Sequence, residues 1–377
     1  MKIGILGGGQ LGKMLYAPAN KLDVDIRFMD SMTEGPVSKI AINYTVGDIT
    51  DYDDVMAFGS ECDILSIEIE KVNCKALKEL EKSGVTVYPQ PDILELIQDK
   101  GLQKDFYKRQ GLPTSDFNFF DTISDLEDAI VKGEVKYPFV QKLRKDGYDG
   151  RGVQIIRKET DLSQAFKSNF ITEDLVTIHK EIGVITCRDA NGQVVVYDPV
   201  EMVFHADANI LLYQLSPADI SDKVINQAKD LAIKTTEAYD IVGLLAIEMF
   251  LTQSGELMIN EVAPRPHNSG HHSIEATMCS QYENQLRTLS NLPLGDTTTI
   301  TTSLLMNVLG AEGYTGPVFY EGIEKVLAIP GVNLHLYGKT TTKPFRKMGH
   351  INIVGESPEE LVAHYHYITD NFRVISN

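Results

Sequence analysis

Two glutamates in the second half of the chain lie inside apolar stretches. A carboxylate in such a stretch is unusual and suggests a chemical role. Glu248 lies in LLAIEMFLT and Glu261 in LMINEVA, on either side of a turn signal at Ser254-Gly255. If this turn sets the register, Glu248 falls opposite Glu261, with Cβ atoms roughly 5 Å apart. Like charges that face each other across two strands destabilise them, so a shared proton, a pair of lysines or a bound cation must compensate.

A bound magnesium ion is the compensation that these residue types favour. Mg²⁺ takes oxygen ligands and commonly uses one or two carboxylates together with substrate phosphates. Asn260 adds an amide oxygen next to Glu261. The alternative is that both acids lie on a solvated edge, but the flanking residues are too apolar for a fully wet hairpin. We therefore predict a metal site on Glu248 and Glu261, and a salt bridge that fills the gap between these acids would count against it.

A glycine motif near the N-terminus predicts a second ligand site. The apolar stretch Lys2–Leu6 is followed by Gly7, Gly9 and Gly12 in the spacing G-x-G-x-x-G, and Asp30 follows a second apolar stretch. This pattern is typical of dinucleotide binding. Any strand and helix that present a glycine turn to a phosphate require the same residues. The residues alone therefore leave both NAD and another phosphate-bearing ligand open.

The elements around this motif alternate between strand and helix signals up to residue 88, which predicts a parallel, doubly wound sheet. The acids Glu68 and Glu70, in SIEIE, come at the carboxyl end of one of these strands, where open α/β sheets bind their ligands. The alternative for Glu70 is a solvated strand end. A charged helical stretch at 92–110 comes next, and we place a domain boundary just before it.

A strand lysine and a glycine-rich loop follow in this second domain. Lys142 ends the stretch YPFVQK, and the sequence DGYDGRG occupies 146–152. Three glycines in six residues make a loop whose backbone N–H groups can fold over phosphates. The spacing G-x-x-x-x-G-K-[ST] of a P-loop is absent, and an ordinary hairpin turn is the alternative.

Two later stretches complete the candidate residues. APRPHNSGHH is a proline-stiffened loop after the hairpin, and we interpret His271 and His272 in it as structural or solvated rather than as metal ligands. Residues 325–355 contain no Asp or Glu in an otherwise acidic chain, so their bases predict a phosphate site, with a solvated basic face as the alternative. These bases are Lys325, Lys339, Lys343, Arg346 and Lys347.

The composition limits the class of partner. Of the 377 residues, 35 are basic and 53 acidic, for a formal charge of -18. This balance argues against nucleic-acid and anionic-membrane binding, which need a basic surface. The chain opens without a signal-peptide pattern, its longest apolar run is too short to span a bilayer, and its four cysteines show no CxxC spacing. We therefore expect a cytoplasmic protein with reduced thiols.

Four parts of the chain together resemble a known family. They are GILGGGQLGKML, DGYDGRG, NEVAPRPHNSGHHSIEA with SQYENQLR after it, and YGK…RKMGH. In this order they resemble the ATP-grasp superfamily of carboxylate–amine ligases, and within it the 5-(carboxyamino)imidazole ribonucleotide synthetases. The resemblance runs from end to end and implies three parts. These are a pre-ATP-grasp α/β domain at 1–97, an ATP-grasp domain at 98–300 with a hinge near 173–176, and a small C-terminal β-rich domain at 301–377.

The resemblance also implies roles for individual residues. Mg²⁺ would bind Glu248 and Glu261, and the glycine turn would hold a ribonucleotide rather than NAD. The catalytic group, where bicarbonate and an acyl phosphate would lie, comprises Arg265, His267, Asn268 and Lys142. ATP would contact Lys100, Lys142, Gly147, Tyr148, Asp149, Gly150, Arg151, Gly152, Val153, Glu173, Asp174, Leu175, Val176, Glu181, His205, Asn260 and Glu261. The ribonucleotide would contact Gly9, Gln10, Leu11, Glu70, Lys339, Arg346 and Lys347.

The implied reaction is the ATP-dependent carboxylation of 5-aminoimidazole ribonucleotide by bicarbonate, through carboxyphosphate, in a homodimeric enzyme of purine biosynthesis. The sequence departs from the family at Lys100, where arginine is usual, and at Val153, where glutamine is usual. The nearest alternative is another ATP-grasp ligase of purine intermediates, such as the formate-dependent glycinamide ribonucleotide transformylase. An alternative of a different class is an NAD-dependent oxidoreductase that would use the glycine motif and Asp30. A third is a non-catalytic nucleotide-binding protein, which the intact set of candidate metal and phosphate ligands disfavours.

Overall fold

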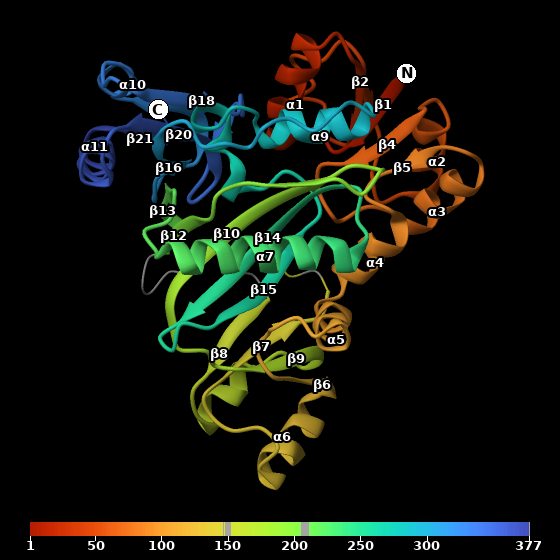
Figure 1. The fold of residues 1–377 in the computed structure, drawn as a ribbon, viewed down its shortest axis with the longest axis vertical. Helices are drawn as coiled ribbons and strands as arrows, with labels where there is room; N and C mark the ends of the chain where they lie inside the picture. The colour runs from red at the N-terminus through yellow and green to blue at the C-terminus, as the bar shows by residue number, and fades with distance from the viewer. Residues whose placement is uncertain (146, 148–151, 205–210, 377) are drawn as a thin grey trace.

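The computed structural model describes residues 1–377 except 146, 148–151, 205–210 and 377 (Figure 1). The N-terminal unit consists of β1 (Lys2–Leu6), α1 (Gln10–Lys21), β2 (Asp25–Asp30), β3 (Tyr44–Val46), α2 (Tyr52–Gly59), β4 (Ile64–Ile67), α3 (Cys74–Lys82) and β5 (Thr86–Val87). Its strands pair in parallel in the order β3-β2-β1-β4-β5. Ile3 and Phe28 pack with residues of α1, and Leu65 packs with residues of α2 and α3. The doubly wound parallel sheet predicted from the sequence is confirmed.

Two helices, α4 (Pro91–Gln98) and α5 (Lys100–Gln110), divide the helical stretch predicted at 92–110. The chain breaks between them at Asp99, whose carboxylate accepts hydrogen bonds from the N–H groups of Gly101 (2.9 Å) and Leu102 (3.2 Å) and so caps α5. The same carboxylate binds Arg144 at 2.7 Å. This cap fixes the first turn of α5, where Lys100 lies.

Four further strands of the described chain form an antiparallel sheet in the lower lobe of Figure 1. They are β6 (Phe117–Thr122), β7 (Phe139–Leu143), β8 (Val153–Ile156) and β9 (Ser168–Asp174), in the order β6-β9-β7-β8. Leu126 of α6 (Ile123–Lys132) packs on Phe120, Phe139 and Phe170 of this sheet, and the short 3₁₀ helix η1 (Glu159–Gln164) adds Leu162. Strands β7 and β9, which carry Lys142 and Glu173, pair directly.

Nine of the described strands form the largest sheet, which crosses the middle of the molecule (Figure 1). Its order is β15-β14-β10-β12-β13-β16-β20-β18, with β11 paired to β10. The strands are β10 (Ile178–Arg188), β11 (Val194–Val196), β12 (Val200–Phe204), β13 (Leu211–Ser216), β14 (Gly243–Thr252), β15 (Leu257–Ala263), β16 (Thr302–Leu309), β18 (Val332–Leu336) and β20 (Lys347–Gly355). Helix α7 (Asp222–Tyr239) buries Ala228 and Ala232 against Ile182, Val184 and Ile247 of this sheet.

The C-terminal β-rich part does not stand apart from the central sheet, because β16, β20 and β18 extend that sheet beyond β13. A separate small sheet of β17 (Gly316–Glu321), β19 (Thr341–Thr342) and β21 (Arg373–Ser376) lies beside it. Helix α11 (Pro358–Asn371) packs Leu361 and Ile368 against Leu304 and Ile351 of the central sheet, and α10 (Ile323–Leu327) adds Val326. None of the described helices is both long enough and apolar enough to cross a membrane.

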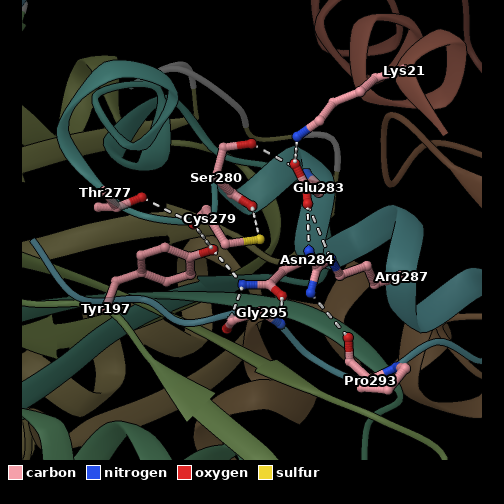
Figure 2. A network of polar contacts seen from close by, with 10 residues as sticks. All are labelled: Lys21, Tyr197, Thr277, Cys279, Ser280, Glu283, Asn284, Arg287, Pro293 and Gly295. Atoms are coloured by element: carbon pink, nitrogen blue, oxygen red, sulfur yellow. Dashed lines mark hydrogen bonds and ion pairs between the residues drawn. The ribbon is translucent and has the colours of Figure 1, made fainter.

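The segment between β15 and β16 joins the N-terminal unit to the central sheet through η2 (Asn268–Gly270), α8 (Ser273–Ala276) and α9 (Gln281–Leu289). Figure 2 shows how the motif SQYENQLR makes this connection. Glu283 binds Lys21 of α1 at 3.0 Å and Arg287 at 2.6 Å. Asn284 donates to the hydroxyl of Tyr197 at 2.8 Å. Through these contacts the motif holds α9 against α1 of the N-terminal unit and against Tyr197, which lies between β11 and β12 of the central sheet.

Candidate active site

The hairpin of β14 and β15 brings Glu248 and Glu261 face to face, as predicted. Close to the turn, however, Leu251 pairs with Leu257, which is one residue away from the partner that the predicted register gives it. A β-bulge at Asn260 then restores the predicted pairing of the acids. The prediction was therefore correct through two compensating features, a three-residue turn and a bulge.

The two acids have opposite pKa shifts, because burial raises the pKa of Glu248 whereas the charge of Lys100 lowers that of Glu261. Desolvation, followed by the charge of Glu261, raises the pKa of Glu248 to about 8. Lys100 is the main cause that lowers the pKa of Glu261 to about 2. Lys100 forms an ion pair with Glu261, whereas His267 Nε2 lies 3.6 Å from Glu248 Oε1. Lys100 therefore favours the ionised form of Glu261, and burial favours the neutral form of Glu248.

The ion pair bears directly on the predicted metal site, since a salt bridge between the acids would count against it. Lys100 compensates one acid, which matches the lysine alternative that the sequence left open. The donors nevertheless fit Mg²⁺, because two facing carboxylates and the amide oxygen of Asn260 are the ligand types that it takes together with a nucleotide. Within the described chain no group of three or more His, Cys, Asp and Glu side chains could enclose a metal. The geometry fits an ion that arrives with phosphates better than a permanently caged ion.

Lys142 contacts residues of two sheets, the four-stranded sheet and the central sheet. Its Nζ lies 2.9 Å from Asn260 Oδ1 on β15 and 2.9 Å from Glu173 Oε1 on β9. Burial alone would raise the pKa of Glu173, but the charges of Lys142 and Lys104 lower it to about 2. The carboxylate of Glu173 thus faces inward, and the link at 174–176 after it is partly or fully exposed. This placement suits the predicted hinge, whose backbone would contact the adenine base of ATP.

Glu181 lies on the same face of the central sheet as Glu248, because Gly183 pairs with Glu248 and Glu181 is two residues away along β10. Burial raises the pKa of Glu181 to about 7, and the charge of Lys142 opposes this shift. Glu181, which was predicted to bind ribose hydroxyls, is therefore close to Lys142. His205 lies outside the described residues.

The predicted glycine loop begins and ends beside Lys142. Val153 pairs with Lys142, and the N–H of Leu143 donates to the carbonyl of Gly152 at 2.8 Å. The ion pair of Arg144 with Asp99 fixes the entry to the loop. Of the predicted loop residues, Gly147, Gly152 and Val153 are described, and Tyr148, Asp149, Gly150 and Arg151 lie outside the described residues.

The loop after β15 brings the predicted catalytic residues toward the N-terminal unit. Arg265 Nε lies 2.9 Å from Glu70 Oε1, so one predicted catalytic residue meets one predicted substrate residue. His267 Nδ1 lies 2.8 Å from Ser269 Oγ, and Asn268 starts η2. Gln281 of α9 accepts a hydrogen bond from the N–H of His267 (2.9 Å) and donates to its carbonyl (2.8 Å). Our sequence reasoning missed Gln281, although its position in SQYENQLR was a signal.

The histidines that follow are buried, in agreement with their structural interpretation. His271 Nδ1 lies 2.8 Å from the hydroxyl of Tyr282, and His272 Nδ1 lies 3.0 Å from the carbonyl oxygen of Ser269. The ring of His271 lies 4.7 Å from that of His350 on β20. This group of rings packs the loop after β15 against the C-terminal strands.

The glycine turn and the basic C-terminal stretch lie next to each other. Lys13 of α1 donates to the carbonyl of Leu336 at 2.8 Å, at the end of β18. Lys339 donates to the carbonyl of Lys347 at 2.7 Å, and Arg346 donates to the carbonyl of Thr341 at 2.9 Å. The contact of Lys13 thus places the end of β18 next to α1, whereas Lys339 and Arg346 donate to carbonyls of the basic stretch itself.

Glu68, which the sequence placed with Glu70 at the carboxyl end of a strand, binds the backbone of the glycine turn. Its carboxylate accepts hydrogen bonds from the N–H groups of Gly9 (2.5 Å) and Leu11 (2.9 Å), while Asp30 accepts one from Gly8 (2.7 Å). A dinucleotide would need the amides at this helix start for its pyrophosphate. The geometry therefore disfavours NAD binding, and the amides of Gly9 and Leu11, which were predicted to contact a ribonucleotide, are engaged by Glu68.

Comparisons with known proteins agree with this arrangement. The family models that match are a ribonucleotide synthetase preATP-grasp domain at residues 1–98, an ATP-grasp domain at 105–282 and a phosphoribosylaminoimidazole carboxylase C-terminal domain at 303–364. The N5-carboxyaminoimidazole ribonucleotide synthase of Bacillus subtilis is 32% identical over 96% of this chain and 93% of its own. The Saccharomyces cerevisiae phosphoribosylaminoimidazole carboxylase is 36% identical over 97% of this chain, which spans 66% of that longer protein.

Solved structures are similar along the whole chain. The N5-carboxyaminoimidazole ribonucleotide synthetase of Thermotoga maritima superposes with a TM-score of 0.91 at 38% identity, over 100% of this chain and 99% of that one. The Aspergillus clavatus enzyme, solved with ADP and 5-aminoimidazole ribonucleotide, gives a TM-score of 0.89 at 30% identity, over 98% of this chain and 97% of that one. The chain therefore belongs to the N5-carboxyaminoimidazole ribonucleotide synthase family of ATP-grasp ligases.

Proposed function

We propose that this protein uses ATP to carboxylate 5-aminoimidazole ribonucleotide with bicarbonate, yielding N5-carboxyaminoimidazole ribonucleotide, ADP and phosphate. The observation that supports this proposal most is the contact of Arg265 with Glu70. It joins the loop after β15, next to Glu261, to the N-terminal unit, which we propose binds the ribonucleotide. A ligase must bring its activated carboxyl donor and its amine acceptor to one place. We infer that the facing acids and Lys142 border that place on the ATP side, and that the basic C-terminal stretch borders it on the ribonucleotide side.

Activation of bicarbonate requires positioned charge rather than a protein nucleophile. Transfer of the γ-phosphoryl group from ATP to bicarbonate produces carboxyphosphate, and charge spreads over the phosphoryl oxygens during the transfer. We propose that Lys142 and Arg265 neutralise this charge. A magnesium ion on Glu248 and Glu261 would supply further charge neutralisation and orient the phosphates. The amide of Asn260 would keep Lys142 directed at the nucleotide.

Carboxyphosphate hydrolyses quickly in water, so the site must exclude solvent while the amine reacts. We assign this task to the glycine loop, whose two ends lie beside Lys142. The exocyclic amine of the ribonucleotide then takes the carboxyl group, directly or after release of CO₂ in the closed site. His267, held through its backbone by Gln281, is placed to orient the amine or to accept its proton.

The 5′-phosphate of the ribonucleotide would be held by Lys339, Arg346 and Lys347 at the edge of the N-terminal unit. We predict that Lys347→Ala raises the KM for the ribonucleotide about tenfold, because one charged contact to a phosphate is lost. The KM for ATP, measured in the same steady-state assay, should change less than about twofold. Equal increases in both constants would show that this base does not contact the substrate phosphate.

An ADP-release assay tests the proposed function. ADP should form with 5-aminoimidazole ribonucleotide only when bicarbonate is present, and the product should retain label from ¹⁴C-bicarbonate after trapping. Formate with glycinamide ribonucleotide tests the transformylase alternative in the same assay. ADP release with that pair, and none with the first, would reject the proposal.

We also propose an oligomeric state and a localisation for this protein. A homodimer agrees with the exposure of Met278 (64%) and Ile300 (56%), whose segments adjoin at an isolated β-bridge between Thr277 and Thr299. Light scattering after size-exclusion chromatography measures this directly. Cytoplasmic localisation agrees with the four cysteines, which are buried free thiols.

A further inference from the structure

We propose that Lys104 is a positioning residue of the ATP site, which acts through Glu173 on Lys142. This inference rests on the proposed role of Lys142 in holding ATP phosphates. Lys104 lies on α5, faces away from solvent, and belongs to none of the motifs that drew attention in the sequence. The contacts of Lys104 in the structure are the basis for this role, which its place in the sequence did not indicate.

Lys104 is almost fully enclosed and its ammonium group is fully used. The residue is 3% exposed, and its Nζ lies 2.7 Å from Thr114 Oγ1, 2.9 Å from Ser115 Oγ and 2.9 Å from Glu173 Oε2. These three contacts match the three protons of an ammonium group. Ser115 also donates to Glu173 Oε2 at 2.7 Å. The orientation of Lys104 is thus fixed, and so is the oxygen of Glu173 that it holds.

Glu173 divides its two oxygens between two lysines. Oε2 receives Lys104, and Oε1 lies 2.9 Å from the Nζ of Lys142. Lys142 has its other contact with Asn260 Oδ1, also at 2.9 Å. Because the carboxylate is 4% exposed and held on its far side, it presents one fixed oxygen to Lys142.

The same cluster reaches the strand that carries Asn260. Thr114 Oγ1, which Lys104 contacts, donates to the carbonyl of Ile259 at 2.7 Å, and the N–H of Ile259 donates to the carbonyl of Pro113 at 2.8 Å. Ile259 immediately precedes the bulge at Asn260. Lys104 therefore supports both partners of Lys142, the acid on β9 and the amide on β15.

Charge balance explains why a buried lysine at this place matters for phosphate binding. Two lysines share one carboxylate, so the cluster carries a surplus positive charge in a site of low dielectric, where an anion is attracted strongly. Without Lys104, the full charge of Glu173 would act on Lys142 and draw its ammonium away from a phosphate. A buried ion pair is often no more stabilising than a well-packed apolar pair, so stability alone explains this cluster poorly.

The test compares Lys104→Met with Lys104→Arg and with a matched control, Lys108→Met, one turn further along α5 and exposed. Lys104→Met should raise the KM and the Kd for ATP by on the order of tenfold, while the KM for the ribonucleotide changes less than about twofold. Lys104→Arg should restore part of the ATP affinity, because it retains the charge. Lys108→Met should match the wild type in all three constants. An unchanged KM and Kd for ATP in Lys104→Met would overturn the inference.

A double-mutant cycle tests whether the effect passes through Glu173. In the Glu173→Gln background, Lys104→Met should change the Kd for ATP much less than in the wild type, since the charge that Lys104 balances is gone. Equal effects in both backgrounds would overturn the proposed route. If Lys104→Met does not fold, Ser115→Ala is a smaller change, because it removes the hydroxyl that contacts Lys104 and Glu173 but keeps the buried charges. It should raise the Kd for ATP about threefold, and no change would count against the inference.

These outcomes are distinct from a failure of the proposed function. Absence of bicarbonate-dependent ADP release in the wild type would reject the proposed reaction, whatever Lys104 does. The Kd for ATP reports on Lys104 directly and does not require turnover. A loss of thermal stability in Lys104→Met with unaltered ATP affinity would assign it a purely structural role and reject the positioning role.

Discussion

Replacing Glu261 with glutamine is expected to reduce bicarbonate-dependent ATP turnover by on the order of 10³-fold, the loss typical when a site loses a charged group that stabilises the transition state. Glu261 is the ionised member of the acid pair, and its charge is needed both by Lys100 and by the proposed magnesium ion. Glutamine keeps the shape of the side chain and its carbonyl oxygen but removes that charge. The fold should persist, because β14 and β15 pair through their backbones.

Steady-state ADP release at saturating ATP and Mg²⁺ measures this effect, and circular dichroism with a thermal melt verifies the fold. Glu256→Gln is a matched control, since Glu256 lies in the same hairpin but is exposed next to the turn. It should retain the activity of the wild type. Turnover of Glu261→Gln within about threefold of the wild type would contradict the assignment of Glu261 as a metal ligand, because one lost charge at such a site has a far larger effect.

Acidification from pH 6.5 toward pH 4 is expected to destabilise the protein steeply. Burial lowers the pKa of His272 to about 4, and burial lowers the pKa of His271 and of His350 well below the ordinary value. In the unfolded chain each of these rings takes up a proton near pH 6.5. Below that pH the unfolded state binds more protons than the folded state. The free energy of unfolding therefore falls by up to about 1.4 kcal/mol per pH unit for each histidine, until the folded pKa is reached.

Urea unfolding at several pH values between 7.5 and 4.5 measures this slope. His272→Gln removes one titrating ring, so its slope should be shallower than that of the wild type by about 1.4 kcal/mol per pH unit between pH 6 and pH 5. His179→Gln, at an exposed position on β10, is the control and should leave the slope unchanged. Parallel curves for the wild type and His272→Gln would refute the buried, neutral state of this ring.

Local patterns predicted much of the fold and part of the site. Alternating strand and helix signals were sufficient for the parallel N-terminal sheet, because each βα unit is specified within a short stretch. The opposition of Glu248 and Glu261 followed from the turn between them, although a bulge was needed to produce it. The continuation of the central sheet into β16 was not predicted, since a strand pairing depends on a partner far along the chain. The break at Asp99 was not predicted either, although its cap is a local contact.

The sequence by itself determined which kinds of groups the protein would use: a hairpin with two acids, a strand lysine, glycine turns and a basic stretch without acids. Only the tertiary structure decided how these groups are paired. Lys100 joins Glu261 across 161 positions, Lys142 joins Asn260 across 118, and Glu68 joins Gly9 across 59. The physical reason is that a buried charge is compensated by whichever opposite group the packing brings near it. Neither the turn nor the periodicity of a strand carries that information.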